Sequence, residues 1–328
     1  MHVLEPQALI RCLQQHTTRK DWWVAYSGGM DSQVLLHLLH AARSQLDASY
    51  RCAALHIHHG LHPEADHWAA HCAAVCRDLA IPLQILKVNA RPNKDQSLEE
   101  AARAARMAAF KDFLGAEAAL VLAHHADDQA ETILWRLFRG AGPQGLGGMR
   151  TLQAWGSLEL IRPFLSISKE TLAHYAKSHA LNWICDPSND DIGFDRNFLR
   201  HQVIPMLVAR WPKVLANINR SGALSAELAL AVEAKAEQLL SGVLVSEQSA
   251  TVAHPAVSVP ALLRFEPAWR HAIIRAWLKR GGYAYPSYAH MQRIDAEVLG
   301  AQSGAKPRLK IGDYTLVRVG KVLKILVE

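Results

Sequence analysis

The hexapeptide Ser27-Gly28-Gly29-Met30-Asp31-Ser32 constrains the fold of this chain more than any other stretch. It follows a short apolar run, Trp22 to Ala25, and opens a segment, Ser32 to Leu46, in which apolar residues recur at helical spacing. This order predicts a strand, a tight turn and a helix. The paired glycines allow successive backbone N–H groups to turn toward one point, which the N-terminus of the helix also faces. Such a point is typical of a binding site for an anion, and a phosphate is the simplest candidate.

The first 200 residues alternate between short apolar runs and helical patterns, which predicts a parallel sheet covered by helices on both faces. Strands are expected at residues 22–25, 50–57, 83–88, 119–123 and 158–161. Helices are expected at residues 4–18, 32–46, 64–79, 97–114 and 169–179, with one more ending near residue 139. Ligands of such sheets bind beyond the carboxyl ends of the strands. Three polar segments, 27–32, 56–62 and 124–132, are expected at these ends.

A second domain is expected after residue 210, because one long helical pattern extends from Pro212 to about Leu240. We therefore predict a nucleotide-binding domain at 1–210, and a linker helix followed by a smaller basic α+β domain at 211–328. The net charge of +6 is uneven, with −1 in residues 1–200 and +7 in residues 201–328. This excess suits a bound polyanion, and it equally suits a basic domain without such a partner.

Composition predicts a cytoplasmic protein that does not enter a membrane. The chain contains no run of about 18 or more uncharged apolar residues. Glu5 and Arg11 interrupt the region where a signal peptide needs an unbroken apolar core. Five scattered cysteines predict a reducing compartment and no disulfide framework.

The segment 124–132 contains Asp127, Asp128 and Glu131. Asp128 and Glu131 alone fit a helix capping box. Three carboxylates beside a phosphate site also suit Mg²⁺, a hard cation that prefers oxygen ligands, and we favour this second interpretation.

Two further segments are ambiguous. The four histidines between His56 and His62 are candidates for zinc, but they follow a strand end in an expected nucleotide-binding fold. A pocket for adenine and ribose is therefore the favoured interpretation. The segment Gly140–Met149 is so rich in glycine that we expect no regular element there. We expect a flap or an RNA-facing loop, with a plain linker as the alternative.

The hexapeptide lacks the lysine and the spacing of a Walker loop. It resembles the S-G-G-x-D-S signature of the N-type ATP pyrophosphatases, the PP-loop family. Residues 20 to about 205 also resemble, in more detail, the tRNA(Ile)-lysidine synthetases within that family. The motifs that carry this resemblance are Ser27–Ser32, His56–Leu61, Ala102–Arg106, His124–Thr132, Arg139–Gly142, Arg162–Leu165 and Trp183–Arg200.

The resemblance implies ATP-dependent ligation of L-lysine to a tRNA. In this family, the C2 oxygen of the wobble cytidine in the CAU anticodon of tRNA(Ile) attacks ATP and releases pyrophosphate. The ε-amine of lysine then displaces AMP to give lysidine. The implied partners are therefore ATP, Mg²⁺, L-lysine and tRNA(Ile), and the sequence leaves open whether the protein is a monomer or a homodimer.

On this resemblance we assign roles to individual residues. We expect catalytic roles for Asp31, His125, Asp128, Glu131 and Arg196, ATP binding by Ser27, Gly28, Gly29, Met30, Asp31, Ser32 and His56, Mg²⁺ binding by Asp31 and Glu131, and tRNA binding by Arg139 and Arg200.

The chain departs from the family pattern at three positions. His58 and His62 stand where Asn and Arg are expected, and Met107 stands where an aromatic residue is usual. These differences concern the adenosine pocket. We also expect no additional C-terminal domain of the kind seen in longer members, and therefore a looser hold on the acceptor arm of the tRNA.

Two other functions compete with this one. Another PP-loop enzyme is one rival, but thiolation usually needs a C-x-x-C pair, which the chain lacks, and an amide synthetase usually needs a glutaminase-like region. A catalytically silent tRNA-binding protein is the other rival. The intact S-G-G-x-D-S loop with its acidic cluster argues against it.

Overall fold

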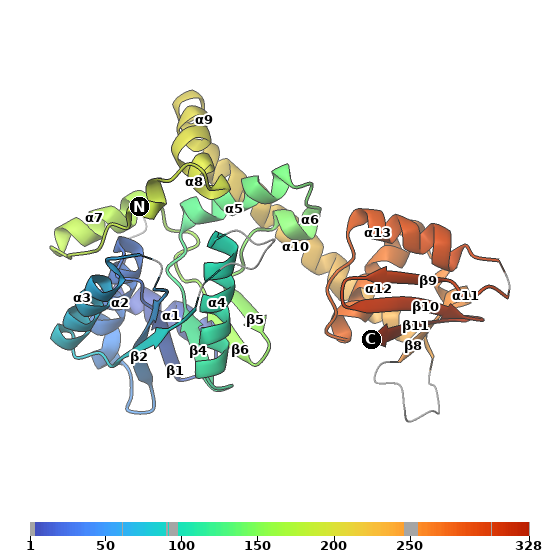
Figure 1. Cartoon of the computed structure of the whole chain (residues 1–328), viewed down its shortest axis with the longest axis horizontal. Coiled ribbons are helices and arrows are strands. Elements are labelled where there is room, and N and C mark those ends of the chain that lie inside the picture. The colour runs from blue at the N-terminus through green and yellow to red at the C-terminus, as the bar shows by residue number, and fades with distance from the viewer. Residues whose placement is uncertain are drawn as a thin grey trace. The chain divides into compact units, whose positions relative to one another are not determined.

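The computed structural model describes residues 4–60, 62–89, 91, 98–245, 255–302 and 304–327. The chain divides into two compact units, Met1–Ala226 and Glu227–Glu328 (Figure 1). The division falls within a single long helix, α10 (Val214–Ser241). This helix confirms the long helical pattern expected from residue 212 to about 240.

The first unit is built on a six-stranded sheet with the strand order β3-β2-β1-β4-β6-β5. All neighbours pair in parallel except β5 and β6. The connection reverses direction between β1 and β4, which makes the carboxyl ends of these two strands the expected ligand site. The strands are β1 (Asp21–Ala25), β2 (Arg51–His58), β3 (Leu83–Lys87), β4 (Ala118–Val121), β5 (Leu152–Trp155) and β6 (Leu158–Ile161).

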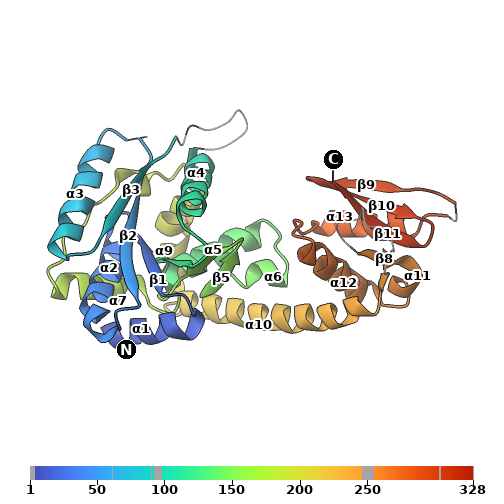
Figure 2. The same cartoon turned by 90° about the horizontal axis from the view of Figure 1, so that it is seen from below.

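Helices cover both faces of this sheet, as the sequence predicted (Figure 2). Side chains alternate along β1, so Trp22 and Val24 pack on one face while Trp23 packs on the other. The first face is covered by α1 (Pro6–His16), α2 (Met30–Ala42), α3 (Ala65–Asp78) and α7 (Lys169–Ser178). The second face is covered by α4 (Leu98–Phe113), through Phe110 and the following Leu114.

The prediction that Gly140–Met149 holds no regular element is wrong. Residues Pro143–Leu146 form one turn of helix, α6. Proline at the first helical position costs no hydrogen bond there. The Arg136 guanidinium donates to the carbonyls of Gly145 and Gly148 at 2.9 and 2.8 Å, and these tertiary bonds hold a turn that glycine content alone disfavours.

The chain between 187 and 210 forms short helical pieces that lead into α10. These pieces are a 3₁₀ turn (Pro187–Asp190), α8 (Asp195–Phe198), a π-helical turn (Leu199–Val203) and α9 (Ile204–Arg210). Isolated π turns are rare and occur often at functional sites. This one carries Arg200.

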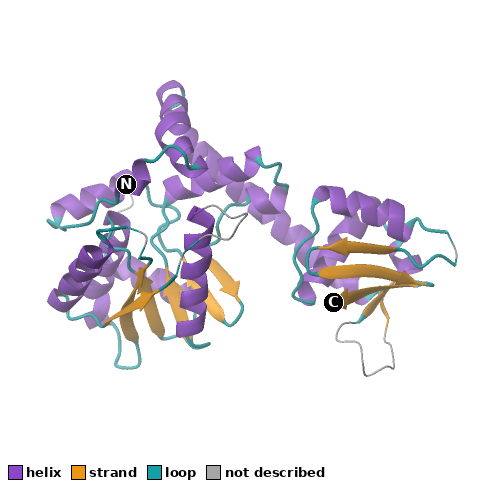
Figure 3. Cartoon of the chain, viewed as in Figure 1, coloured by secondary structure: helices purple, strands orange, loops and turns teal. Residues whose placement is uncertain are grey.

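The second unit is an α+β domain with an antiparallel sheet in the order β7-β8-β11-β10-β9 (Figure 3). Turns at Gly312 and Gly320 connect its last three strands, and both glycines have positive φ. Its core surrounds Trp277. The elements are β7 (Leu244–Val245), β8 (Ala256–Ser258), α11 (Val259–Leu262), α12 (Pro267–Arg280), α13 (Tyr288–Arg293), β9 (Arg308–Ile311), β10 (Tyr314–Val319) and β11 (Val322–Val327). Within the described part of the chain, no helix has both the length and the apolar character needed to span a bilayer.

Candidate active site

The glycine loop joins β1 to α2 and packs closely against Ile184 and Cys72. Gly28 has φ +85°, and a Cβ on it would lie 2.6 Å from Ile184 Cδ1 and 3.0 Å from Cys72 Sγ. Only glycine fits this conformation and this space. The Gly28 carbonyl also accepts a hydrogen bond from the Ile184 amide at 2.9 Å.

The front of the loop is suited to an anion. Helix α2 begins at Met30, and its N-cap, Gly29, has no side chain with which to bond the first amides of the helix. These amides remain available for a ligand. Ser27 Oγ lies 3.1 Å from Ser32 Oγ, which also donates to the Gly29 carbonyl at 3.0 Å. The structure therefore brings the predicted loop residues into one short turn at the switch point of the sheet.

The histidines after β2 take part in local contacts. The buried His56 places Nδ1 2.9 Å from the Tyr26 carbonyl, which fixes the end of β2 against the end of β1. His58 contacts Asp66 at 3.0 Å, and His62 stacks on Trp68. In the described ranges, no group of three or more His, Cys, Asp or Glu side chains is arranged so that these alone could hold a metal ion. Nucleotide binding by His56 stays a prediction.

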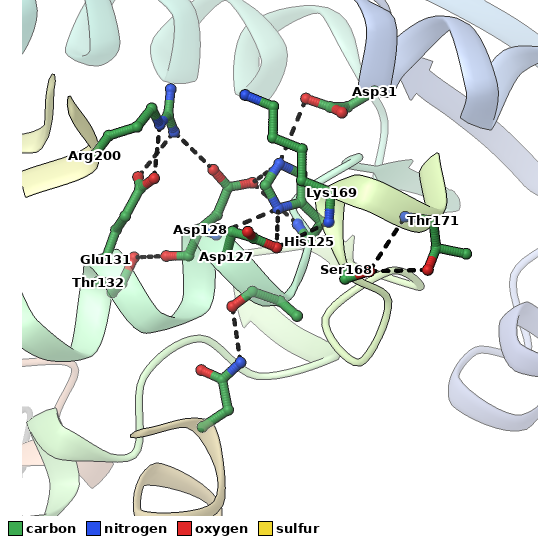
Figure 4. Close-up of polar contacts among 12 residues, drawn as sticks. Asp31, His125, Asp127, Asp128, Glu131, Thr132, Ser168, Lys169, Thr171 and Arg200 are labelled. Atoms are coloured by element: carbon green, nitrogen blue, oxygen red, sulfur yellow. Dashed lines mark hydrogen bonds and ion pairs between the residues drawn. The ribbon is translucent and has the colours of Figure 1, made fainter. Parts of the chain in front are cut away.

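His125 is the centre of an acidic cluster at the carboxyl end of β4 (Figure 4). It is the N-cap residue of α5 (Ala126–Phe138), and its ring lies 3.6 Å from Asp31 Oδ2, 3.6 Å from Asp127 Oδ2 and 3.4 Å from Asp128 Oδ2. Burial by itself would lower the pKa of His125, but the three carboxylates raise it to about 10. The ring is therefore a cation at neutral pH.

Asp128 also caps its own helix. Its Oδ2 accepts a hydrogen bond from the backbone N–H of His125 at 3.0 Å. Asp128 is thus the third residue of α5 and bonds the backbone of the N-cap residue His125, instead of forming a capping box with Glu131 as the sequence pattern suggested. Glu131 is left for another partner.

That partner is Arg200, on the π-helical turn. Its guanidinium donates to both oxygens of Glu131, at 2.6 and 2.8 Å, and to Asp128 Oδ1 at 3.0 Å. Burial raises the pKa of Glu131, while Arg200 acts in the opposite direction. We predicted metal binding for Glu131 and tRNA binding for Arg200. The structure instead pairs the two side chains with each other, and both roles stay predictions.

Asp31 is the better candidate for a metal ligand. Its Oδ1 is buried without a hydrogen-bond partner, while its Oδ2 faces His125. A buried oxygen without a partner beside a phosphate-binding loop fits Mg²⁺. Glu131 fits less well, because Arg200 occupies both of its oxygens.

Lys169 was missed by the sequence analysis. It is the first residue of α7, and its backbone N–H donates to Asp127 Oδ2 at 2.8 Å. In Figure 4 its side chain extends beside His125 toward Asp31. One sequence signal could have indicated it, because Lys169 begins a helix soon after β6. The carboxyl end of this parallel strand lies at the same edge of the sheet as the glycine loop.

Arginines make the far end of α5 basic. The Arg139 and Arg196 guanidiniums lie 4.4 and 5.9 Å from the centre of the Trp135 ring. Burial and the charges of several arginines, Arg162 first among them, lower the pKa of His124 to about 3, so this histidine is neutral. The site thus has an acidic centre and a basic flank.

Comparison with known proteins identifies the family. A PP-loop domain model matches residues 4–207, and a TilS substrate binding domain model matches residues 258–323. The tRNA(Ile)-lysidine synthase of Yersinia pseudotuberculosis (strain IP 31758) is 42% identical over 304 residues, which are 92% of this chain and 65% of that protein. The protein of the same name from Serratia proteamaculans is 41% identical, over 92% of this chain and 67% of its own. The chain belongs to the tRNA(Ile)-lysidine synthase family.

The match covers only part of the length of the relatives. The chain spans slightly less than two thirds of the length of the Yersinia relative. Among solved structures, the U34-tRNA thiolase NcsA from Methanococcus maripaludis has a TM-score of 0.56 at 14% identity, over 68% of this chain and 78% of that one. This second likeness concerns the fold alone.

We predict that Gly28→Ala destabilises the protein by about 1–3 kcal/mol and abolishes nucleotide binding, because the left-handed φ is strained for alanine. Gly29→Ala is the matched control, since Gly29 has φ −73° and a Cβ there meets only Ser27 Oγ at 3.4 Å. Urea unfolding and calorimetric ATP titration measure both effects. Equal losses in the two variants would contradict this account of the loop.

We also predict a pH-dependent contribution of His125 to stability. Its pKa is raised from about 6.5 to about 10, so the stabilisation is complete below pH 6.5 and disappears as pH rises through 10. His125→Asn keeps an N-cap and removes the titration. In EDTA and without nucleotide, the difference in unfolding free energy between wild type and variant should shrink steadily from pH 6.5 to 10. A difference that stays constant or grows over this range would show that His125 is not the buried cation.

Proposed function

We propose that the protein ligates L-lysine to C2 of the wobble cytidine in the CAU anticodon of tRNA(Ile), with ATP as the activating substrate. The observation that carries this proposal is the placement of the anion-binding glycine loop against the His125 cluster, within a chain of the tRNA(Ile)-lysidine synthase family. The reaction passes through an adenylated tRNA. We place it in the cytoplasm, where tRNA, ATP and lysine are available.

In the first step the cytidine O2 attacks the α-phosphorus of ATP, and the bond to the β-phosphate breaks. Backbone amides of Gly28, Gly29 and Met30, with the hydroxyls of Ser27 and Ser32, hold the departing pyrophosphate. The His125 cation and Arg196 offset charge on the α-phosphate. Such fixed donors act where charge develops in the transition state. His56 keeps the floor of the nucleotide pocket in place through Tyr26.

In the second step the ε-amine of lysine attacks C2, and the C2–O bond breaks to release AMP. The attacking amine must lose a proton. Asp128 is the candidate to accept it or to orient the cytidine, since it lies at the start of α5 between His125 and Arg200. Arg200 orients Asp128 from the other side. Arg139 and the basic second unit are the proposed contacts for the tRNA.

Mg²⁺ fits this site through Asp31 and the phosphate oxygens of ATP. When bound, it would neutralise charge on the triphosphate. The chain's own residues hold the carboxylate in place, because His125 contacts the other Asp31 oxygen.

The decisive measurement is incorporation of labelled lysine into unfractionated tRNA. We expect incorporation only with ATP present, with one AMP and one pyrophosphate formed per lysine. Asp128→Ala should reduce the rate by at least tenfold, because a positioned proton acceptor contributes about 10²–10⁴-fold. Formation of ADP, or ATP turnover that needs neither tRNA nor lysine, would rule out the proposal.

A Mg²⁺ titration separates the two carboxylates predicted to bind the metal. Asp31→Asn should raise the Mg²⁺ concentration for half-maximal activity about tenfold or more, because it loses a charged ligand. Glu131→Gln should lower the rate without this shift, because its oxygens serve Arg200. An equal shift in both variants would show that Glu131 leaves Arg200 to bind the metal. No shift in either variant would contradict the metal site.

A further inference from the structure

We propose that Trp135, Arg139 and Arg196 form a stacking platform that binds a nucleotide of the anticodon loop close to the cytidine being modified. This platform rests on the function proposed above and names the place where the substrate RNA docks. No sequence motif connects these three residues. The sequence predicted separate roles for Arg139 and Arg196 and no role for Trp135.

The platform lies on the same face of α5 as the proposed chemistry. Asp128, Glu131 and Trp135 are separated by three and four residues, the spacing of one helical face. Seven residues of helix place Trp135 about 10 Å beyond Asp128 along the axis. A short single strand of RNA covers such a distance, so a base bound at Trp135 belongs to the same loop as the target cytidine.

A second segment runs beside this face and contacts it twice. Arg200 pairs with Asp128 and Glu131, and Arg196, four residues earlier, lies 5.9 Å from the centre of the Trp135 ring. The Trp135 Nε1–H also donates to Asp195 Oδ2 at 3.3 Å. The indole is therefore held in one orientation, as a docking surface requires.

The cations at Trp135 have no acidic partner of their own. Among the residues that the structure describes, neither Arg139 nor Arg196 forms an ion pair, and both contact the ring. The Asp195 carboxylate accepts a hydrogen bond from the indole. Arg136 adds a further guanidinium, which donates to backbone carbonyls. This excess of positive charge around an aromatic ring suits a polyanion.

Single-stranded RNA has the two features that this surface would recognise. Its bases stack on aromatic rings and on planar guanidinium groups, and its phosphates pair with arginine. The guanidinium of Arg139 lies over the indole and the residue is exposed, so in this proposal a base stacks on the side of the guanidinium that faces away from the ring. Phe138, next to Arg139 and 66% exposed, provides further apolar surface at the same helix end. The competing explanation is that the Trp135–Arg196 contact only fixes α8 on α5.

The test uses the full-length protein and an RNA hairpin with the CAU anticodon loop, with binding followed by fluorescence anisotropy. Trp135→Ala should weaken binding roughly ten- to a hundredfold, which is the effect of losing one stacked base. Trp135→Phe should recover most of the affinity. Arg139→Lys should weaken binding with an unchanged salt dependence, because it keeps the charge and loses the plane. Arg139→Gln should lower the slope of log K against log salt by about 0.7.

The matched control is Trp155→Ala. Trp155 is a partly buried indole at the end of β5, where the antiparallel pairing with β6 places it at the opposite edge of the sheet. This variant should bind the hairpin like wild type. Thermal melting of each variant shows whether any loss of hairpin affinity reflects unfolding. If Trp135→Ala fails to fold, the two Arg139 variants test the platform instead.

The result that overturns the platform is a folded Trp135→Ala protein that binds the hairpin like wild type, or an Arg139→Gln protein with an unchanged salt slope. Failure of the proposed function looks different. In that case wild-type protein would incorporate no lysine, while hairpin binding and its loss in Trp135→Ala would still be observed.

Discussion

The site depends on one electrostatic arrangement, in which the buried His125 and the half-buried Arg200 separate carboxylates that would otherwise repel. Asp31, Asp127 and Asp128 surround His125, while Asp128 and Glu131 share Arg200. Removing either cation would leave carboxylates close together in a desolvated place, which is costly. The arrangement also connects the glycine loop, α5, α7 and the π-helical turn. Four carboxylates against His125, Arg200 and Lys169 leave an excess of negative charge, which the proposed Mg²⁺ would offset.

The topology of the sheet explains why these distant segments meet. Parallel strands place their carboxyl ends at one edge, and the reversal between β1 and β4 opens a space there. The glycine loop follows β1, His125 follows β4 and Lys169 follows β6. Arg200 lies outside the sheet, on a π turn after α8, and reaches the site through Asp128 and Glu131.

Local patterns predicted most of the fold. The period of apolar residues and the glycines at turns are properties of neighbouring residues, so the strands and helices up to α7 and the helix α10 were found near their observed positions. The short helix α6 was missed because its support comes from Arg136 and Gln129, which bind its backbone and the adjacent Met149 from α5. The hairpin strand β5 was missed because four half-exposed residues carry little pattern.

The partners of charged side chains were less predictable. Glu131 and Arg200 are 69 residues apart, and the sequence predicted metal binding for Glu131 and tRNA binding for Arg200. Trp135 carries no motif, so its contacts with two arginines were visible only in three dimensions.

Helix α5 fixes the distance between Asp128, the proposed proton acceptor, and Trp135, the proposed RNA contact. It carries Asp128 at its first turn and Trp135 two turns later on the same face, and the rise of a helix sets their separation at about 10 Å. An RNA loop held at Trp135 is therefore placed relative to the chemistry by one rigid element. The basic second unit has a different task in this scheme. Its charge attracts the tRNA over a distance and raises affinity. Because salt screens this attraction, it does not fix the position of the target base. Affinity and placement of the target base would then depend on different parts of the chain.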